Sequence, residues 1–385
     1  MQIKTFKEAG RYTAVDLTPV QARHLIDAKI ARVTPSFVPG RFDVEVGFVA
    51  GLVACDGANI VIEPKLPVAH LLWMLTRASS LPAWDKAPVG MMKADIVPAF
   101  IDLLCLHIGR AVETGLLSGY WSVDDTSPVL RGRVRLTDQI MRHQHHLYPL
   151  EVTYDEYGHD IAENQVLLAA LLKARQMVAS GQNHGLLARI NRLLTRFGGV
   201  TPLTQGHRLP AWKKSRLNQH YLPALGLAQL FMGDEGLDMA GGDVMGDGFI
   251  IRMPELFERF ILAVMREEFP SLSVDGQVKT RFVTGPTGNA HRSMRPDIVV
   301  GNSAGVRYVM DTKYKKADPT MSDLYQLNAY ADTFDIDEVT LIYAEPVAGH
   351  VLHTSAGKRI HVRGIDLEVD QSAILEQIRQ LVDLP

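Results

Sequence analysis

The stretch from Met294 to Lys316, MRPDIVVGNSAGVRYVMDTKYKK, contains two short apolar runs separated by a segment of glycine and small polar residues. Such a pattern is typical of a β-hairpin. Side chains alternate between the two faces of a strand, so a hairpin centred near Ser303 sets Asp297 opposite position 309 and points Asp297, Asp311 and Lys313 to one face. The sequence therefore predicts two carboxylates and one ammonium group side by side.

Two carboxylates on one face repel each other when they are buried, and a cation between them removes this repulsion. Ligation by oxygen alone suits Mg²⁺ or Mn²⁺. We therefore predict a metal held by Asp297 and Asp311, with Lys313 orienting or activating a water against a phosphate that the metal polarises. The alternative is an exposed hairpin with ordinary surface charges, because a short motif such as D-x-K often occurs by chance.

Two predicted helices on either side of the hairpin add polar residues to this set. Upstream, MPELFERF begins a helix with Glu255 and Glu258 one turn apart. Downstream, DLYQLNAY has helical spacing, which places Gln326 and Tyr330 on one helical face. The order along the chain is a helix carboxylate, R-P-D, D-x-K and Q-x-x-x-Y.

This ordered set resembles the PD-(D/E)xK nuclease superfamily. The resemblance implies a catalytic site for phosphodiester hydrolysis that consists of a core triad, a helix acid and a trailing Q-x-x-x-Y element, here Asp297, Asp311, Lys313, Glu258, Gln326 and Tyr330. It also implies that Asp297 and Asp311, with Glu258, hold Mg²⁺ or Mn²⁺. The second acidic position is Asp311, where the superfamily formula also permits glutamate.

Other stretches narrow the resemblance. They are VGFVAG with IEPK between 46 and 65, SGYWS with LRGRVRL between 118 and 136, TYDEYGHDIAENQVLLAAL at 153–171, MPELFERF, RPDIVV and DTKYK. Together they resemble the McrC family, the nuclease subunits of McrBC-type modification-dependent restriction systems. The resemblance implies an McrB-like AAA+ GTPase hexamer as partner, which recognises modified double-stranded DNA and translocates it, and whose GTPase activity the subunit stimulates.

Composition describes an ordinary globular protein. The chain has 385 residues, of which 46% are hydrophobic and 22% charged, enough for two or three domains. Its net charge of −3 is not that of a nucleic-acid binder, so DNA contact needs a local patch or a partner. Two cysteines that are far apart in the sequence argue against a cysteine-based zinc module. We expect a cytoplasmic protein without membrane contact, because the sequence shows no signal peptide and no apolar run near the roughly 20 residues that span a bilayer.

Three regions are predicted. Residues 1–80 form a β-rich module, which is either a plain structural barrel or, as the resemblance implies, the part that docks the partner. Residues 81–245 are mainly helical with a basic β segment. Residues 246–385 form an α/β nuclease domain with a mixed central sheet flanked by helices. The main boundary lies in the glycine-rich and acidic segment 233–248, which we interpret as a linker or long loop.

The periodicity of apolar residues predicts the individual elements. Beyond the hairpin, strands are expected at 42–53, 60–62, 118–136, 339–343, 350–353 and 359–362. Helices are expected at 71–78, 96–117, 156–174, 186–197, 221–232, 255–268, 323–332 and 372–384.

Several basic stretches have two interpretations. Arg131, Arg133 and Arg135 alternate along the expected strand, which favours a solvated or ion-paired face over contact with a partner or with DNA phosphates. His143 and His145 lack a carboxylate or cysteine at ligand spacing, so 141–146 is interpreted as a polar surface loop rather than a metal site. The run WKKSR at 212–216 is either a solvated loop or a phosphate contact.

Three functions remain open. The chain contains no G-x-x-x-x-G-K-[ST] loop, so any nucleotide hydrolysis belongs to another chain. Besides a nuclease subunit, the chain is compatible with a non-cleaving assembly and activation protein of the ring, or with a stand-alone DNA repair nuclease. The intact Asp297, Asp311 and Lys313 argue against the first alternative, and the long N-terminal region without a DNA-reading motif argues against the second. One active site cuts one strand, so double-strand cleavage needs two complexes to pair or two sequential cuts.

Overall fold

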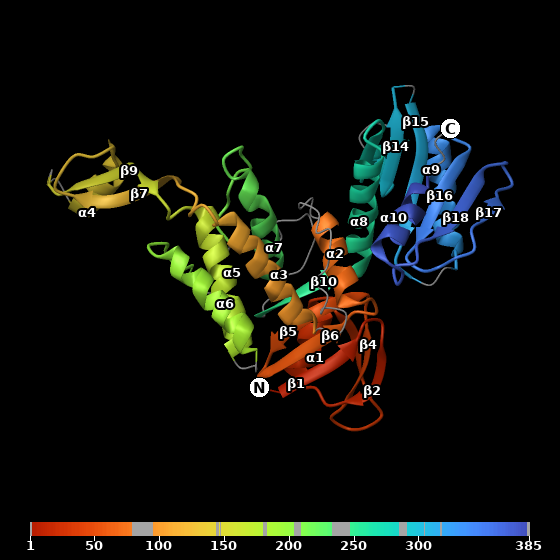
Figure 1. Cartoon of the computed structure of the whole chain (residues 1–385), viewed down its shortest axis with the longest axis horizontal. Coiled ribbons are helices and arrows are strands. Elements are labelled where there is room, and N and C mark those ends of the chain that lie inside the picture. The colour runs from red at the N-terminus through yellow and green to blue at the C-terminus, as the bar shows by residue number, and fades with distance from the viewer. Residues whose placement is uncertain are drawn as a thin grey trace. The chain divides into compact units, whose positions relative to one another are not determined.

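The computed structural model describes residues 2–78, 95–143, 146, 148–179, 183–203, 209–232, 247–284, 291–303, 305–315 and 318–382 (Figure 1). The chain forms two compact units, Met1–Ala99 with Met239–Pro385, and Phe100–Asp238. No helix in the described ranges is long and apolar enough to cross a membrane. The predicted linker lies outside the described residues up to residue 246, and its last two residues, Asp247 and Gly248, instead begin a strand. The three-region division stays a prediction.

The N-terminal part of the first unit is a β-rich module, as predicted. Its elements are β1 (Gln2–Lys7), β2 (Arg11–Val15), α1 (Pro19–Asp27), β3 (Ala31–Pro35), β4 (Phe42–Val46), β5 (Val49–Cys55) and β6 (Ala58–Glu63). One sheet has the order β2-β4-β3 and the other β1-β6-β5-β10. Helix α1 was not predicted. It begins with a capping box in which Thr18 and Gln21 satisfy each other's backbone N–H groups.

Strand β10 (Asp247–Arg252) joins this module to the C-terminal part of the same unit. It pairs antiparallel with β5. Gly51 of β5 has a φ of +139°, and a Cβ there would lie 2.2 Å from the Phe249 carbonyl oxygen, so only glycine fits this crossing. Helix α8 (Met253–Glu268) follows directly, and its first N–H donates to the Phe48 carbonyl at 3.0 Å.

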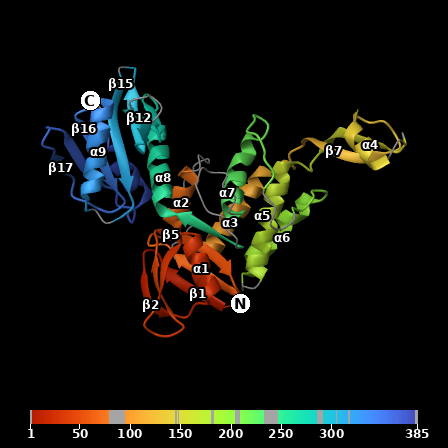
Figure 2. The same ribbon diagram turned by 180° about the vertical axis from the view of Figure 1, so that it is seen from behind.

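The C-terminal part is the predicted α/β fold (Figures 1 and 2). Its six-stranded sheet has the order β11-β14-β15-β16-β18-β17, in which β15, β16 and β18 run parallel and the other neighbours pair antiparallel. The elements are β11 (Ser273–Gly276), β14 (Ile298–Asn302), β15 (Gly305–Lys313), α9 (Met321–Phe334), β16 (Glu338–Tyr343), β17 (His350–His353), β18 (Arg359–Gly364) and α10 (Gln371–Arg379), with a separate hairpin β12 (Thr280–Thr284) and β13 (His291–Met294). Helices α8 and α9 lie on opposite faces, which confirms a mixed sheet flanked by helices.

The central hairpin β14–β15 is confirmed, but its register differs from the prediction by two residues. Ile298 pairs with Met310, which sets Asp297 opposite position 311 rather than 309. A β-bulge between Val300 and Gly301, where the partner changes from Tyr308 to Val306, shifts the pairing. Because side chains alternate with a period of two, this shift leaves the predicted residues on the same face.

The second unit contains helices and a small three-stranded sheet. Its elements are α3 (Ile96–Ala111), β7 (Gly119–Ser127), β8 (Arg133–Val134), α4 (Leu136–His143), β9 (Leu150–Gly158), α5 (Ala162–Ala179), α6 (His184–Leu194) and α7 (Leu222–Met232). The helix predicted from 156 begins at Ala162, because the residues before it pair with β7 as strand β9. The strand predicted over 118–136 ends at Ser127, and the loop predicted from 141 is in part helix α4.

Candidate active site

The predicted site residues all belong to the first unit. Asp297 immediately precedes β14, and the hairpin brings it to the end of β15, the strand that carries the D-x-K motif. The two flanking helices supply the remainder: α8 carries Glu258, and α9 carries Gln326 and Tyr330. Local β pairing therefore accounts for the carboxylate pair, and helix packing on the two faces accounts for the other residues.

Asp297 is fixed by a residue that the sequence did not single out. Its Oδ2 accepts hydrogen bonds from the backbone N–H of Thr312 at 2.7 Å and from the Thr312 hydroxyl at 2.8 Å. Burial raises the pKa of Asp297, the charge of Glu258 raises it further, and the Thr312 bonds only partly oppose this. Thr312 stands between the two charged residues of D-x-K, where the motif permits any residue.

Asp311 and Lys313 form a buried ion pair between Oδ2 and Nζ. Burial and the neighbouring Asp297 raise the pKa of Asp311, while Lys313 lowers it. For Lys313, burial works to lower the pKa, but the carboxylates of Asp311, Asp297 and Asp323 together raise it above its ordinary value. Lys313 is therefore an ammonium ion near neutral pH, which donates hydrogen bonds and does not accept a proton.

Gln326 and Tyr330 support this pair from helix α9. The Gln326 amide donates to the Tyr330 hydroxyl at 2.6 Å and lies 3.5 Å from Oδ1 of Asp311. The Tyr330 hydroxyl in turn donates to the Arg295 carbonyl at 3.1 Å. The predicted i and i+4 pair thus links Asp311 to the chain just before Asp297.

Glu258 reaches the same neighbourhood from helix α8. Its Oε1 accepts a hydrogen bond from the side-chain amide of Gln277 at 2.6 Å, and the backbone N–H of Gln277 donates to the Asp297 carbonyl at 3.1 Å. Burial raises the pKa of Glu258, and the charges of Asp311 and Glu255 raise it further. Gln277 is a second residue that sequence reasoning missed, because it lies between elements and no periodic pattern marks it.

The carboxylates of the site differ in how far they fit the predicted metal. Within the described ranges, no group of three His, Cys, Asp or Glu side chains lies close enough together to hold a metal ion. Instead, Asp311 forms an ion pair with Lys313, and Glu258 accepts a hydrogen bond from Gln277. The chemistry of the carboxylates nevertheless fits a divalent cation. The pKa values of Asp297, Asp311 and Glu258 are all raised, so their negative charge is under-compensated, and their oxygens are the ligands that Mg²⁺ and Mn²⁺ prefer.

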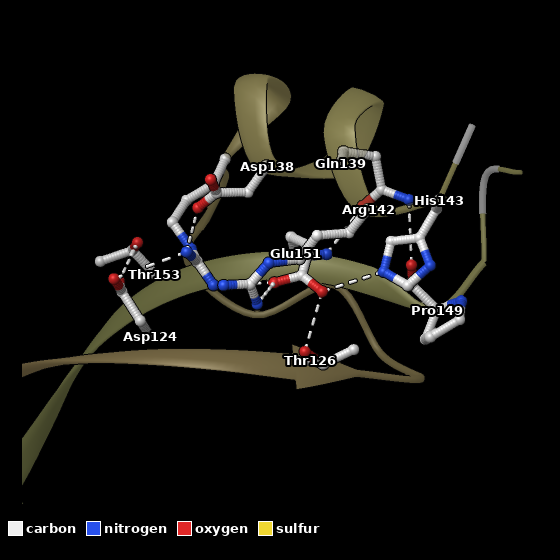
Figure 3. Close-up of polar contacts among 10 residues, drawn as sticks. Asp124, Thr126, Asp138, Gln139, Arg142, His143, Pro149, Glu151 and Thr153 are labelled. Carbon is white, nitrogen blue, oxygen red and sulfur yellow. Dashed lines mark hydrogen bonds and ion pairs between the residues drawn. The ribbon is translucent and has the colours of Figure 1, made fainter. Parts of the chain in front are cut away.

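The basic strand predicted in the second unit is partly an internal ion-pair network (Figure 3). Arg135 pairs with Asp124, Asp138 and the buried Glu151. His143 bonds the other oxygen of Glu151 at 2.9 Å, so the predicted surface loop is wrong there; His145 lies outside the described residues.

Outside this network, other basic side chains do face solvent. The guanidinium of Arg131 lies over the Tyr154 ring at 4.0 Å, and Arg133 is exposed. Lys213, Lys214 and Arg216 of the WKKSR run are exposed too.

Comparison with known proteins matched a protein family and several solved structures. The model of the McrBC 5-methylcytosine restriction system component family matches residues 44–344. A half-complex from a tetradecameric assembly of Thermococcus gammatolerans McrB AAA+ hexamers with bound McrC contains a chain that is 18% identical, with 99% of each chain covered and a TM-score of 0.61. A chain of the Thermococcus gammatolerans McrBC complex is 19% identical over 69% of this chain and 87% of that chain, with a TM-score of 0.38. No curated protein matches.

Proposed function

This chain belongs to the McrBC 5-methylcytosine restriction system component family, and from that premise we propose that it is the DNA endonuclease subunit of a modification-dependent restriction system. It hydrolyses phosphodiester bonds of modified double-stranded DNA. The observation that carries the proposal is the convergence of Asp297, Asp311 and Lys313 at one end of the central hairpin. Burial raises the pKa of both carboxylates, the charge of Glu258 raises that of Asp297 further, and the charge of Asp297 raises that of Asp311 further.

Each residue has a part in the proposed reaction. Asp297 and Asp311, with help from Glu258, would hold Mg²⁺ or Mn²⁺, which when bound polarises a phosphoryl oxygen and lowers the pKa of water. Lys313 is positively charged at neutral pH, so it stabilises negative charge that develops on the phosphate and orients the attacking water by donating hydrogen bonds. Thr312 and Gln326 keep the two carboxylates in place.

The proposed partner is an McrB-like AAA+ GTPase hexamer, whose GTPase activity the chain stimulates. Two facts support it: McrC of Thermococcus gammatolerans is bound to McrB hexamers in the similar assembly, and this sequence has no phosphate-binding loop of its own. Because one active site cuts one strand, we also propose that two complexes pair for double-strand cleavage. We place the system in the cytoplasm.

The test is cleavage of methylated and unmethylated plasmid by the full chain with its AAA+ partner, GTP and Mg²⁺. Asp311→Ala and Lys313→Ala are expected to lose roughly 100-fold or more in cleavage rate while they retain stimulation of the GTPase. Lys358→Ala is the matched control, because Lys358 is also a partly buried lysine paired with an aspartate, Asp337, away from the site. If the variants cut like wild type, the chain is a non-cleaving activator of the ring.

A further inference from the structure

Tyr314 immediately follows Lys313, at the point where β15 ends. Its side chain is only 9% exposed and packs edge-on against two rings, Phe48 at 5.7 Å and Phe257 at 6.1 Å between centroids. Phe48 lies in the turn between β4 and β5 of the N-terminal module, and Phe257 directly precedes Glu258 on α8. The residue beside the catalytic lysine is therefore held between the N-terminal module and the helix that carries the candidate acid.

The hydroxyl of Tyr314 faces a buried carboxylate. Glu8, directly after β1, is 2% exposed, and its Oε2 accepts the backbone N–H of Lys65 at 2.9 Å. Its other oxygen, Oε1, is buried and makes no hydrogen bond of regular geometry. Burial raises the pKa of Glu8, and the nearby Tyr314 hydroxyl partly lowers it. A buried carboxylate oxygen without a hydrogen-bond donor destabilises the fold, so a contact between the Tyr314 hydroxyl and the Glu8 carboxylate is energetically favourable.

The chain after Lys313 has two anchors of different kinds. Lys315 forms an ion pair with Asp323, which caps the N-terminus of α9, so that anchor lies on the side of Gln326 and Tyr330. Side chains alternate along the strand, and Tyr314 accordingly anchors the opposite side, against Phe48 and Glu8. Without Tyr314, the chain just after Lys313 would keep its Lys315 anchor but lose this side-chain contact with the N-terminal module.

We propose that Tyr314 is a positioning residue, which locks the end of β15, and with it Lys313, to the N-terminal module through Glu8 and Phe48. The inference rests on the proposed function, since it concerns how precisely the ammonium group of Lys313 is placed. A displacement of the N-terminal module then reaches Lys313 through Tyr314, so a partner bound to the module controls cleavage through this side chain.

The first test compares cleavage by the full chain with its partner, GTP and Mg²⁺. Tyr314→Phe keeps the ring and removes the hydroxyl; it is expected to lower kcat roughly 10- to 100-fold with KM for DNA unchanged. Glu8→Gln is expected to lower kcat as well, and the double variant to be no slower than the slower single variant, because both changes break one contact. Tyr221→Phe, which removes a buried hydroxyl bonded to the Leu117 N–H at 2.8 Å in the other unit, is the control and should keep full activity.

The second test does not depend on cleavage. Acylation of lysines by an amine-reactive reagent is followed by peptide mass spectrometry on the chain alone. Tyr314→Phe should change the labelling rate of Lys313 several-fold and leave Lys358 unchanged; the two side chains are comparably exposed, at 22% and 17%, and each is paired with an aspartate.

The inference is wrong if the labelling of Lys313 is unchanged in Tyr314→Phe. It is also wrong if the labelling changes while kcat stays at the wild-type value. A lowered melting temperature without a change in labelling or kcat means that Tyr314 is only a core residue. If wild type does not cut DNA, the proposed function fails while the labelling result alone decides the role of Tyr314.

Discussion

Replacement of Asp311 by asparagine is expected to stabilise the metal-free protein at pH 8 and to abolish cleavage. Burial beside Asp297 raises the pKa of Asp311 from 3.8 to about 6. A carboxyl group whose pKa is higher in the folded than in the unfolded state stabilises the fold at pH values below its unfolded-state pKa. This stabilisation is lost as the pH rises through its folded-state pKa. A pKa that is higher by roughly two in the folded state lowers the free energy of unfolding at pH 8 by about 3 kcal/mol. Asparagine removes this cost but leaves Lys313 without its charged partner, so we expect the free energy of unfolding to rise by about 1–2 kcal/mol.

Thermal unfolding by calorimetry in EDTA measures this effect. At pH 8 Asp311→Asn should melt roughly 2–6 °C above wild type, and near pH 4 the two should melt together because wild-type Asp311 is then protonated. Addition of Mg²⁺ should raise the melting temperature of wild type more than that of the variant, which lacks a ligand. Asp337→Asn is the control, since Asp337 is 82% exposed and also pairs with a lysine.

The opposite sign would refute the reasoning. If metal-free Asp311→Asn melts below wild type at pH 8, the pair with Lys313 is a net stabilising salt bridge. The carboxylates would then be compensated within the protein itself, and the electrostatic case for a cation at Asp297 and Asp311 would be wrong.

Four further substitutions test the supports of the fold and of the site. Gln326→Ala and Tyr330→Phe should each slow single-turnover cleavage roughly 10- to 100-fold, and wild-type rates would exclude a supporting role for α9. Glu151→Gln leaves two arginines without their buried partner, so amide hydrogen exchange in β9 should quicken by roughly tenfold or more; unchanged exchange would mean that the network contributes nothing. Gly51→Ala forces a Cβ onto the Phe249 carbonyl and should lower the urea midpoint of unfolding, whereas Gly226→Ala, which meets open space within a helix, should not.

The candidate carboxylate pair was predictable because it depends on local β geometry. The register prediction was wrong by two residues, yet Asp297, Asp311 and Lys313 kept their common face, since only an odd shift exchanges the faces of a strand. The helical pair Gln326 and Tyr330 was predictable for the same reason, because i and i+4 side chains meet whatever the helix packs against.

The residues that the sequence did not reveal act through contacts across distant parts of the chain. Gln277 holds Glu258 with its side chain and Asp297 with its backbone N–H, and neither contact leaves a periodic signal. In the second unit, the buried Glu151 pairs with Arg135 and His143. Helix α4 therefore packs with polar side chains against the sheet, and its Ile140 is exposed. Patterns of apolar residues assume an apolar interior, and they fail where a buried carboxylate organises the packing.

The N-terminal module and the C-terminal α/β part of the same unit are closely connected. Strand β10 pairs at the edge of the module's sheet and continues without a loop into α8. The first N–H of α8 donates a hydrogen bond to the Phe48 carbonyl. The same Phe48 packs on Tyr314, next to the candidate catalytic lysine, Lys313. A helix and a strand that both carry candidate catalytic residues, Glu258 and Lys313, are thus tied to one turn of the module. A force applied to that turn therefore acts on both sides of the candidate site at once, which is the mechanical requirement for a nuclease that cuts only when a partner engages it.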